Sequence, residues 1–365
     1  MTTRAAILFA VGEDIRVENL ELAEPCGGEV LVRMHAAGVC HSDWHVVTGA
    51  TPHPLPVVLG HEGSGIVEAV GENVDSVSKG DHVCLNWAPS CGRCFYCTHG
   101  RPALCETYVK PLWAGTMLDG TTRFRQNGQS LFHFSGLACF SERTVVPQQC
   151  CIRIPDAVPF DVAALIGCAV TTGVGAVVNT AKVKPGSSVA VFGCGGVGLS
   201  IILGAKLVDS SVIIAVDKMP TKEGIARTAG ATHFLNGTDA VARIRDLTEG
   251  RGADYVFEAI GLPAVQETAF EAVRPGGALV LAGISPVGSK TNLPGALMTR
   301  QEKTVMGSYY GTSHPRIDFL QIADHFLAKR LPIEKIIGAR YSLDEINTAY
   351  HQTISGQSGR GVIIF

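Results

Sequence analysis

The chain has 365 residues, enough for about two domains. Apolar residues make up 46% of the sequence, charged residues make up 17%, and the formal net charge is -3. This composition is typical of an ordered globular protein, because disordered chains combine low hydrophobicity with high charge. The slightly negative net charge argues against a broad basic surface, so we expect no nucleic-acid partner.

The sequence contains twelve cysteines but does not begin with the pattern of a secretion signal. Cytoplasmic proteins keep their thiols reduced, so clustered cysteines indicate metal or catalytic ligands. The uncharged segment 162–181 is long enough to resemble a membrane span, but it is rich in Gly and Thr. We therefore expect a buried helix there, a cytoplasmic protein and no membrane partner.

The fold class predicted from the chain order is α/β with a separate β-rich domain. Up to about residue 155, short alternating strands such as 29–35 and 65–70 are separated by Gly and Pro turns. From about 170 to 308, strand runs alternate with helix-length segments, which indicates a doubly wound parallel sheet. A final strand-like run, 361–365, needs a partner, which we expect in the first domain. The strands predicted for the parallel sheet are Ser188–Phe192, Val212–Val216, 254–257 and 278–282.

Four cysteines lie close together in a C-x2-C-x2-C-x7-C run, within a loop that contains Gly and Pro. Four thiolates fill the tetrahedral shell of zinc and leave no open position, so the run predicts a structural zinc site. An iron–sulfur cluster is the alternative, but the bacterial cluster motif ends in a three-residue gap and Cys-Pro. The ligands would be Cys91, Cys94, Cys97 and Cys105.

A second set of metal ligands begins with Cys40 and His61, which stand beside carboxylates and Gly turns. Two protein ligands are one short of a catalytic zinc site, which keeps its fourth position for water or substrate. Spacing alone does not choose the third ligand. The candidates include Cys84, Cys139, Cys150, Cys151 and Cys168.

A glycine-rich run follows the predicted strand Ser188–Phe192 and opens the apolar segment 199–207. Its glycines permit a tight turn and a close approach of the backbone to a pyrophosphate, and the helix N-terminus favours the phosphate charge. Asp217, at the end of the next strand, can accept hydrogen bonds from ribose hydroxyls and would repel a 2′-phosphate, so we predict NAD rather than NADP. The run is Gly193, Cys194, Gly195, Gly196, Val197 and Gly198.

Together, the four-cysteine lobe, the Cys/His pair and the dinucleotide motif resemble the zinc-dependent medium-chain alcohol dehydrogenases, over essentially the whole chain. The resemblance implies a GroES-like catalytic domain of residues 1–169 and 309–365, with the structural-zinc lobe at about 91–105. Residues 170–308 would form a Rossmann NAD-binding domain. The resemblance also implies Cys168 as the third ligand of the catalytic zinc, Glu62 as a carboxylate near the metal, and Asp43 as the acid that orients His61.

The same resemblance implies the chemistry. Zinc would act as a Lewis acid on the alcohol, and a hydride would pass to the nicotinamide ring. The alcohol proton would leave through Ser42, the nicotinamide ribose and His45. Trp87 would line the substrate channel, which favours primary or aromatic alcohols. The remaining cofactor contacts would be His41 and Arg360 at the phosphates, Thr172 and Val197 at the nicotinamide, and Lys222 beside Asp217.

His41 stands where the family often has an arginine, and our hypothesis is that this weaker cation loosens NAD. The family resemblance also implies a homo-oligomer, either a dimer or a tetramer.

Two other functions compete with alcohol oxidation. The first is a thiol-adduct formaldehyde dehydrogenase, although Thr51 and Val109 stand where glutathione-dependent relatives use an acid and an arginine. Residues 85–87 and 110–140 also resemble mycothiol-dependent relatives. Such a substrate needs cations at the pocket mouth. Lys110, Arg123 and Arg125 are candidates, and ordinary solvated charges are an equal alternative for all three. The second is a zinc-lobe binding module without catalysis, which the acidic balance and the dinucleotide motif disfavour.

Overall fold

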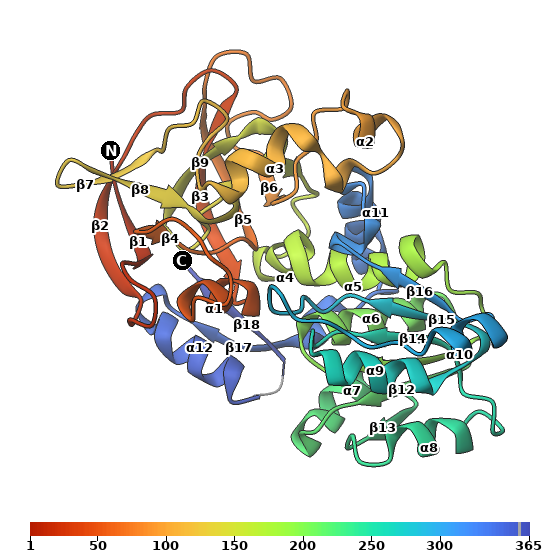
Figure 1. The fold of residues 1–365 in the computed structure, drawn as a ribbon. Helices are drawn as coiled ribbons and strands as arrows, with labels where there is room; N and C mark the ends of the chain where they lie inside the picture. Colours follow the sequence, from red (N-terminus) through yellow and green to blue (C-terminus); the bar gives the residue numbers. More distant parts are fainter. Residues whose placement is uncertain (357–358) are drawn as a thin grey trace.

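The first part of the chain folds into two β layers. The computed structural model describes residues 1–356 and 359–365. Alternation of buried and exposed residues along the strands lets one face of each layer pack inward. One layer closes into a small barrel, seen at the left of Figure 1. Its strands are, in order, β1 (Thr2–Leu8), β2 (Arg16–Leu22), β7 (Phe124–Gln126), β8 (Gln129–His133) and β4 (Val57–Val58).

The second layer is a seven-stranded sheet that includes the C-terminal strand. β18 (Arg360–Ile364) pairs antiparallel with β3 (Glu29–Gly38), with Val362 opposite Gly38. The prediction that the last strand pairs within the first domain is therefore confirmed. The strand order is β10 (Cys151–Arg153), β6 (His82–Leu85), β5 (Gly63–Val70), β3, β18 and β17 (Ile337–Tyr341), with β9 (Arg143–Pro147) also paired to β3.

The later part of the chain forms the predicted parallel sheet. β11 (Ser188–Phe192) and β12 (Val212–Val216) have the predicted bounds, and β14 (Ala253–Glu258) is one residue longer at each end. β15 (Val273–Leu281) begins earlier than predicted. Its N-terminal part lacks an apolar run, so the sequence pattern did not indicate a strand there. The strand order is β13 (His233–Leu235), β12, β11, β14, β15 and β16 (Thr304–Gly307).

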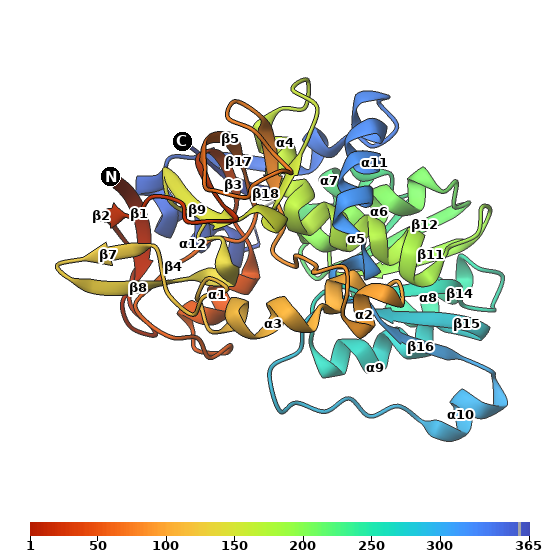
Figure 2. The ribbon, with the colours of Figure 1, turned by 90° about the horizontal axis from the view of Figure 1, so that it is seen from above.

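Helices cover both faces of this sheet, as a doubly wound fold requires. Val189 and Val191 of β11 face the cluster that contains α6 (Gly196–Leu207). Ala190 and Phe192 of β11 point to the opposite face and belong to a second hydrophobic cluster. That cluster contains residues of α8 (Ala240–Asp246) and α9 (Pro263–Ala272). Seen from above, α10 (Gly295–Arg300) and the segment before it extend away from the sheet (Figure 2).

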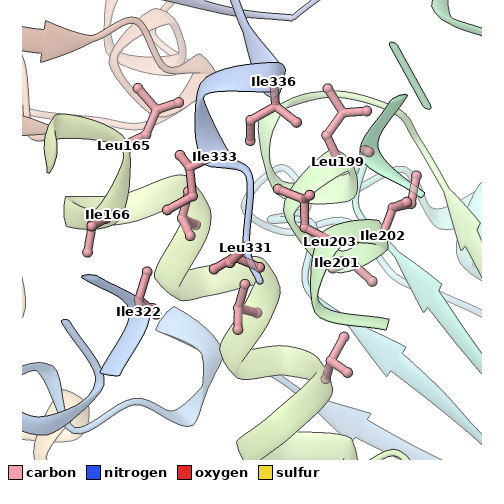
Figure 3. Close-up of a cluster of buried hydrophobic side chains, with 14 of the residues drawn as sticks. Leu165, Ile166, Leu199, Ile201, Ile202, Leu203, Ile322, Leu331, Ile333 and Ile336 are labelled. Atoms are coloured by element: carbon pink, nitrogen blue, oxygen red, sulfur yellow. The ribbon is translucent and has the colours of Figure 1, made fainter. Parts of the chain in front are cut away.

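A continuous apolar helix, Phe160–Ala181, joins the two domains. By length and composition it could cross a membrane, but 89% of its apolar window is buried inside the protein. Figure 3 shows its residues Leu165 and Ile166 in one cluster with side chains of α6. The expected buried helix is therefore confirmed. The predicted domain boundary at 169/170 falls inside it, so the domain limits stay a prediction.

The joining helix contains two π-helical turns. Its successive parts are α4 (Phe160–Leu165), the π-helical turn η4 (Ile166–Val170), α5 (Thr171–Gly175) and the π-helical turn η5 (Ala176–Ala181). The other helices near the sites are α1 (His41–Val47), α2 (Phe95–Thr98), α3 (Glu106–Trp113), η7 (Tyr310–Thr312), α11 (Pro315–Leu327) and α12 (Ile346–Ile354).

Candidate active site

The structure brings the four cysteines of the predicted zinc lobe together. The sulfur atoms all lie within 4.8 Å of one another. Cys94 precedes α2 and Cys105 precedes α3, so two short helices begin at ligands. Hydrogen bonds from Thr107 and from backbone N–H groups lower the pKa of Cys91 to about 6, which favours its thiolate. Four such sulfurs fit one tetrahedral zinc with no open position.

A second donor set lies at the junction of the two domains. Ligand atoms of Cys40, His61 and Cys168 lie within 4.8 Å of one another, together with a carboxylate oxygen of Glu62. All four residues are buried. The adjacent Cys168 thiol lowers the pKa of Cys40 well below its ordinary value by hydrogen bonding. Two sulfurs and one imidazole leave a fourth position, so this set fits a catalytic zinc.

The three donors belong to three different parts of the chain. Their spacing in the sequence therefore does not identify them as one set. Cys40 directly precedes α1, His61 precedes β5, and Cys168 lies in the π-helical turn of the joining helix. The other cysteines that spacing left open are buried outside both donor sets. One of them, Cys84, donates its thiol proton to the Ala163 carbonyl at 3.0 Å.

Asp43 lies where it can orient His61. Its Oδ2 is 3.0 Å from His61 Nδ1, and its Oδ1 accepts a hydrogen bond from the Gly60 amide at 2.8 Å. The other ring nitrogen of His61 is therefore left for the donor set. Burial alone would lower the pKa of His61, but Asp43 and Cys40 outweigh it and raise that pKa well above its ordinary value.

Glu62 does not stand alone beside the donors, because Arg360 pairs with it. Arg360 Nε lies 3.2 Å from Glu62 Oε2, and a second guanidinium nitrogen bonds Oε1. Burial raises the pKa of Glu62 above its ordinary value, although Arg360 opposes this shift. Gly38 makes room for the carboxylate, since a Cβ there would lie 1.9 Å from Glu62 Oε2.

The glycine-rich run forms the turn that the sequence predicts between β11 and α6. Gly193 has φ +97°, a conformation that favours glycine. A Cβ on Gly198 would lie 1.7 Å from the Gly193 carbonyl, so the strand and the helix pack closely. A Cβ on the exposed Gly195 would meet nothing within 4 Å. The open space at the N-terminus of α6 fits a pyrophosphate.

Asp217 stands beside this turn. Its Oδ2 accepts a hydrogen bond from the Cys194 amide at 2.8 Å and one from Lys222 Nζ at 3.1 Å. Its Oδ1 accepts one from the Met219 amide at 3.0 Å. The aspartate is thus held at the end of β12, and a carboxylate there fits the ribose of NAD.

The remaining predicted residues surround the same junction. Ser42 Oγ lies 3.6 Å from Cys40 Sγ, and the half-buried His45 follows in the same helix. Desolvation lowers the pKa of His41, and Arg360, His45 and Lys222 add to this shift while Cys40 opposes it.

Thr172 and Val197 belong to helices that touch. A Cβ on Gly173 would lie 2.6 Å from the Val197 carbonyl, so α5 packs directly against the start of α6. Glycine at position 173 therefore permits the close approach of the two helices.

Aromatic rings form a wall beside His61. Trp87 lies 6.4 Å from His61 between ring centroids, and Phe134 lies 5.5 Å from it. Tyr309 and Tyr310 pack on Trp87 at 5.3 and 4.2 Å. Sequence reasoning found Trp87 but missed Phe134, Tyr309 and Tyr310. Scattered aromatics carry no motif, and only their place in the fold brings them to the donors.

The cations suggested for a thiol adduct do not gather at a pocket mouth. Arg123 is only 5% exposed, and it pairs with Glu29 Oε2 at 2.8 Å and with Asp119 at 2.8 Å. Arg125 lies on the barrel strand β7, opposite Glu21. Lys110 is exposed on α3 and is not among the residues that line the nearby apolar pocket. Of the two interpretations offered for Arg123, a pocket cation or an ordinary solvated charge, neither describes it, because its guanidinium is buried and already paired.

Comparison with known proteins agrees with this geometry. Residues 27–156 match the family described as "Alcohol dehydrogenase GroES-like domain", and residues 196–328 match "Zinc-binding dehydrogenase". The chain is 39% identical to S-(hydroxymethyl)glutathione dehydrogenase of Synechocystis sp., with 100% of both proteins covered. It is 36% identical to NDMA-dependent alcohol dehydrogenase of Amycolatopsis methanolica, over 100% of this chain and 99% of the relative.

The structural comparison gives the same result. The crystal structure of benzyl alcohol dehydrogenase from Acinetobacter calcoaceticus superposes with a TM-score of 0.95 at 31% identity, covering 100% of this chain and 99% of that chain. The GroES-like and Rossmann-like architecture implied by the sequence is thereby confirmed. The chain belongs to the zinc-binding alcohol dehydrogenase family and is an oxidoreductase.

Proposed function

We propose that this enzyme oxidises primary or aromatic alcohols to aldehydes with NAD, in a reversible reaction. One observation carries the proposal. Arg360 pairs with Glu62 beside the buried donor set and also contacts the dinucleotide turn, where a Cβ on Gly196 would lie 3.0 Å from its Cδ. A metal held by the donors and a cofactor held by the turn would therefore be neighbours.

The protein residues have separate tasks in this proposal. Cys40, His61 and Cys168 would hold zinc, which supplies Lewis-acid chemistry that lowers the pKa of an alcohol. The glycine turn and Asp217 would hold NAD, the hydride acceptor. Ser42, beside Cys40, would take the alcohol proton while releasing its own hydroxyl proton, and His45 would pass the released proton toward solvent.

The substrate class follows from the walls around the site. The rings of Trp87 and Phe134 beside His61 support alcohols with apolar or aromatic tails, and a small pocket next to Trp87 is likewise lined mainly by apolar and aromatic side chains. Its lining includes Trp87, Tyr108, Leu112, Trp113 and Tyr309. The ring of Trp87, whose centroid is 6.4 Å from that of His61, would contact the part of the substrate next to the alcohol carbon.

The test is NADH formation with ethanol, hexanol, benzyl alcohol, and formaldehyde with and without glutathione or mycothiol. We expect turnover of hexanol and benzyl alcohol without any thiol. The formaldehyde arms are included because one relative is named for a glutathione adduct. Activity only with formaldehyde plus a thiol would overturn the substrate class, and a protein that binds zinc at the cysteine lobe alone would overturn the mechanism.

We also propose that the enzyme is a cytoplasmic homo-oligomer, a dimer or a tetramer. All twelve cysteines are free, which suits a reducing compartment. β16 is the outer strand of the parallel sheet, and an uncovered edge is a ready pairing surface. The preceding segment exposes Ile284 and Val287, the latter at 83%. Light scattering of the purified protein tests this, and a monomer would refute it.

A further inference from the structure

The helix that carries Cys168 has an irregular turn at that residue. Residues Ile166–Val170 are wound as a π-helix between two α-helical parts. π-helical turns are rare and often mark functional sites, because they change where side chains point. Two side-chain hydroxyls bind carbonyls of this turn. Thr171 Oγ1 donates to the Ile166 carbonyl at 2.7 Å, and the Tyr310 hydroxyl donates to the Gly167 carbonyl.

The second hydrogen bond comes from far along the chain. Tyr310 lies 143 positions after Gly167, in the segment where the chain returns from the parallel sheet to the first domain. Gly167 directly precedes Cys168, so the bond fixes the peptide unit from which the ligand side chain extends. The phenol is buried, at 2% exposure, and water cannot easily replace it.

The segment that carries Tyr310 is held firmly. Tyr310, Gly311 and Thr312 have φ values of +51°, +65° and +51°. A left-handed backbone is sterically unfavourable for residues other than glycine, so the surroundings of Tyr310 and Thr312 must impose it. A Cβ on Gly311 would lie 2.8 Å from Gly175 Cα, which shows how closely the segment packs on the joining helix.

The flanking side chains are fixed as well. The ring of Tyr310 packs on Trp87 with centroids 4.2 Å apart. Thr312 Oγ1 lies 2.7 Å from Thr180 Oγ1, at the end of the same helix. The hydroxyl of Tyr310 therefore reaches Gly167 from a position that is fixed on both sides.

We propose that Tyr310 is a positioning residue for the metal ligand Cys168. Its hydroxyl holds the Gly167 carbonyl, and so it keeps the π-helical turn wound with the thiolate directed at Cys40 and His61. This inference rests on the proposed catalytic zinc site. It gives a role to a tyrosine that the family resemblance did not single out, through its hydrogen bond to the Gly167 carbonyl.

The test compares Tyr310→Phe with Tyr341→Phe. Phenylalanine keeps the ring packing on Trp87 and removes only the hydroxyl, so we expect Tyr310→Phe to fold. Tyr341 is a matched control, because its hydroxyl also bonds a protein oxygen, on Gln352, and the residue belongs to β17 at the edge of the sheet. Thermal unfolding of both variants checks that each is folded.

Two measurements report on the ligand itself. The first is the rate at which EDTA removes zinc from the protein, followed by metal analysis, with the catalytic-site phase assigned by a Cys40→Ser variant. The second is the sulfur-to-cobalt absorption band after cobalt(II) replaces the catalytic zinc. We expect Tyr310→Phe to release this zinc about 5- to 10-fold faster and to shift the band, since one buried hydrogen bond is lost.

The outcomes are distinguishable. Tyr341→Phe should match the unmodified protein in both measurements, and the cysteine-lobe zinc should leave at an unchanged rate in all variants. An unchanged band and release rate in Tyr310→Phe would overturn the inference. Equal acceleration at both zinc sites would also overturn it, because that result indicates general loosening. Unmodified protein that lacks the catalytic-site zinc would refute the proposed function instead.

Discussion

Arg360 and Glu62, which lie 298 positions apart in the sequence, form a buried ion pair at the domain junction. Their side chains are 5% and 0% exposed. One is in the last strand and the other follows a candidate zinc ligand, so the pair joins the two ends of the catalytic domain. A buried pair of this kind adds little net stability by itself, but loss of one partner leaves an uncompensated charge.

The first prediction concerns this pair. Arg360→Leu should lower the free energy of unfolding at pH 7 by about 3–5 kcal/mol, because Glu62 is left buried without its cation. Guanidinium denaturation measures the change. The double variant Glu62→Gln with Arg360→Leu removes both charges and should recover part of the loss. A double variant no more stable than the single one would contradict this explanation.

The second prediction concerns cofactor choice. Asp217→Asn keeps the size of the side chain and removes the charge that would repel a 2′-phosphate. The ratio of kcat/KM for NAD to that for NADP should fall about tenfold, which corresponds to about 1.4 kcal/mol. Asp246→Asn is the control, since this exposed aspartate on α8 pairs with Arg243 at 3.3 Å on the same helix. An unchanged ratio in Asp217→Asn would show that Asp217 does not select the cofactor.

Features that depend on local sequence were predictable. β11 and β12 have the expected bounds because each is a continuous apolar run in a parallel sheet covered on both faces. The glycine turn after β11 was predictable for the same reason, since tight backbone approach needs glycine at fixed positions. The N-terminal part of β15 was not, because Arg274, Pro275 and two glycines interrupt its apolar pattern.

Features that depend on long-range contacts were not predictable from spacing. Cys168 meets Cys40 only through the packing of the joining helix, so its selection required the family resemblance. Arg123 looked available as a surface cation, but its partner Glu29 lies 94 positions earlier in the chain. No local pattern distinguishes a paired arginine from a free one. The same holds for Tyr310, whose hydrogen bond to Gly167 reaches across 143 positions of the chain.

The third prediction concerns the cysteine lobe. Its own apolar cluster contains little beyond Cys105, Tyr108 and Leu112, so the lobe depends on its metal for order. Cys97→Ser should therefore bind one zinc per chain instead of two, and limited proteolysis should cut within residues 91–105. Cys26→Ser is the control, because Cys26 is exposed and belongs to neither donor set. Two retained zinc ions in Cys97→Ser would refute the structural site.

The fourth prediction concerns the pH dependence of stability. Burial lowers the pKa of His133 to about 3, and the nearby Arg123 adds to the shift. His133 Nε2 accepts a hydrogen bond from the Arg123 amide at 2.9 Å, which requires the neutral ring. The unfolded chain takes up this proton at about pH 6.5, so the stabilising contribution is complete above that pH and is lost as the pH falls toward 3.

Between pH 7 and pH 5, this one group should lower the free energy of unfolding by about 2 kcal/mol. His133→Gln keeps an acceptor for the Arg123 amide but does not titrate. Its stability should therefore fall by about 2 kcal/mol less over the same interval, whatever its value at pH 7. The exposed His351→Gln serves as the control and should follow the unmodified protein. Urea denaturation at the two pH values measures all three proteins. If the unmodified protein and His133→Gln lose the same free energy of unfolding, His133 is protonated to the same extent in the folded and unfolded states. That result would contradict a neutral imidazole at this buried position.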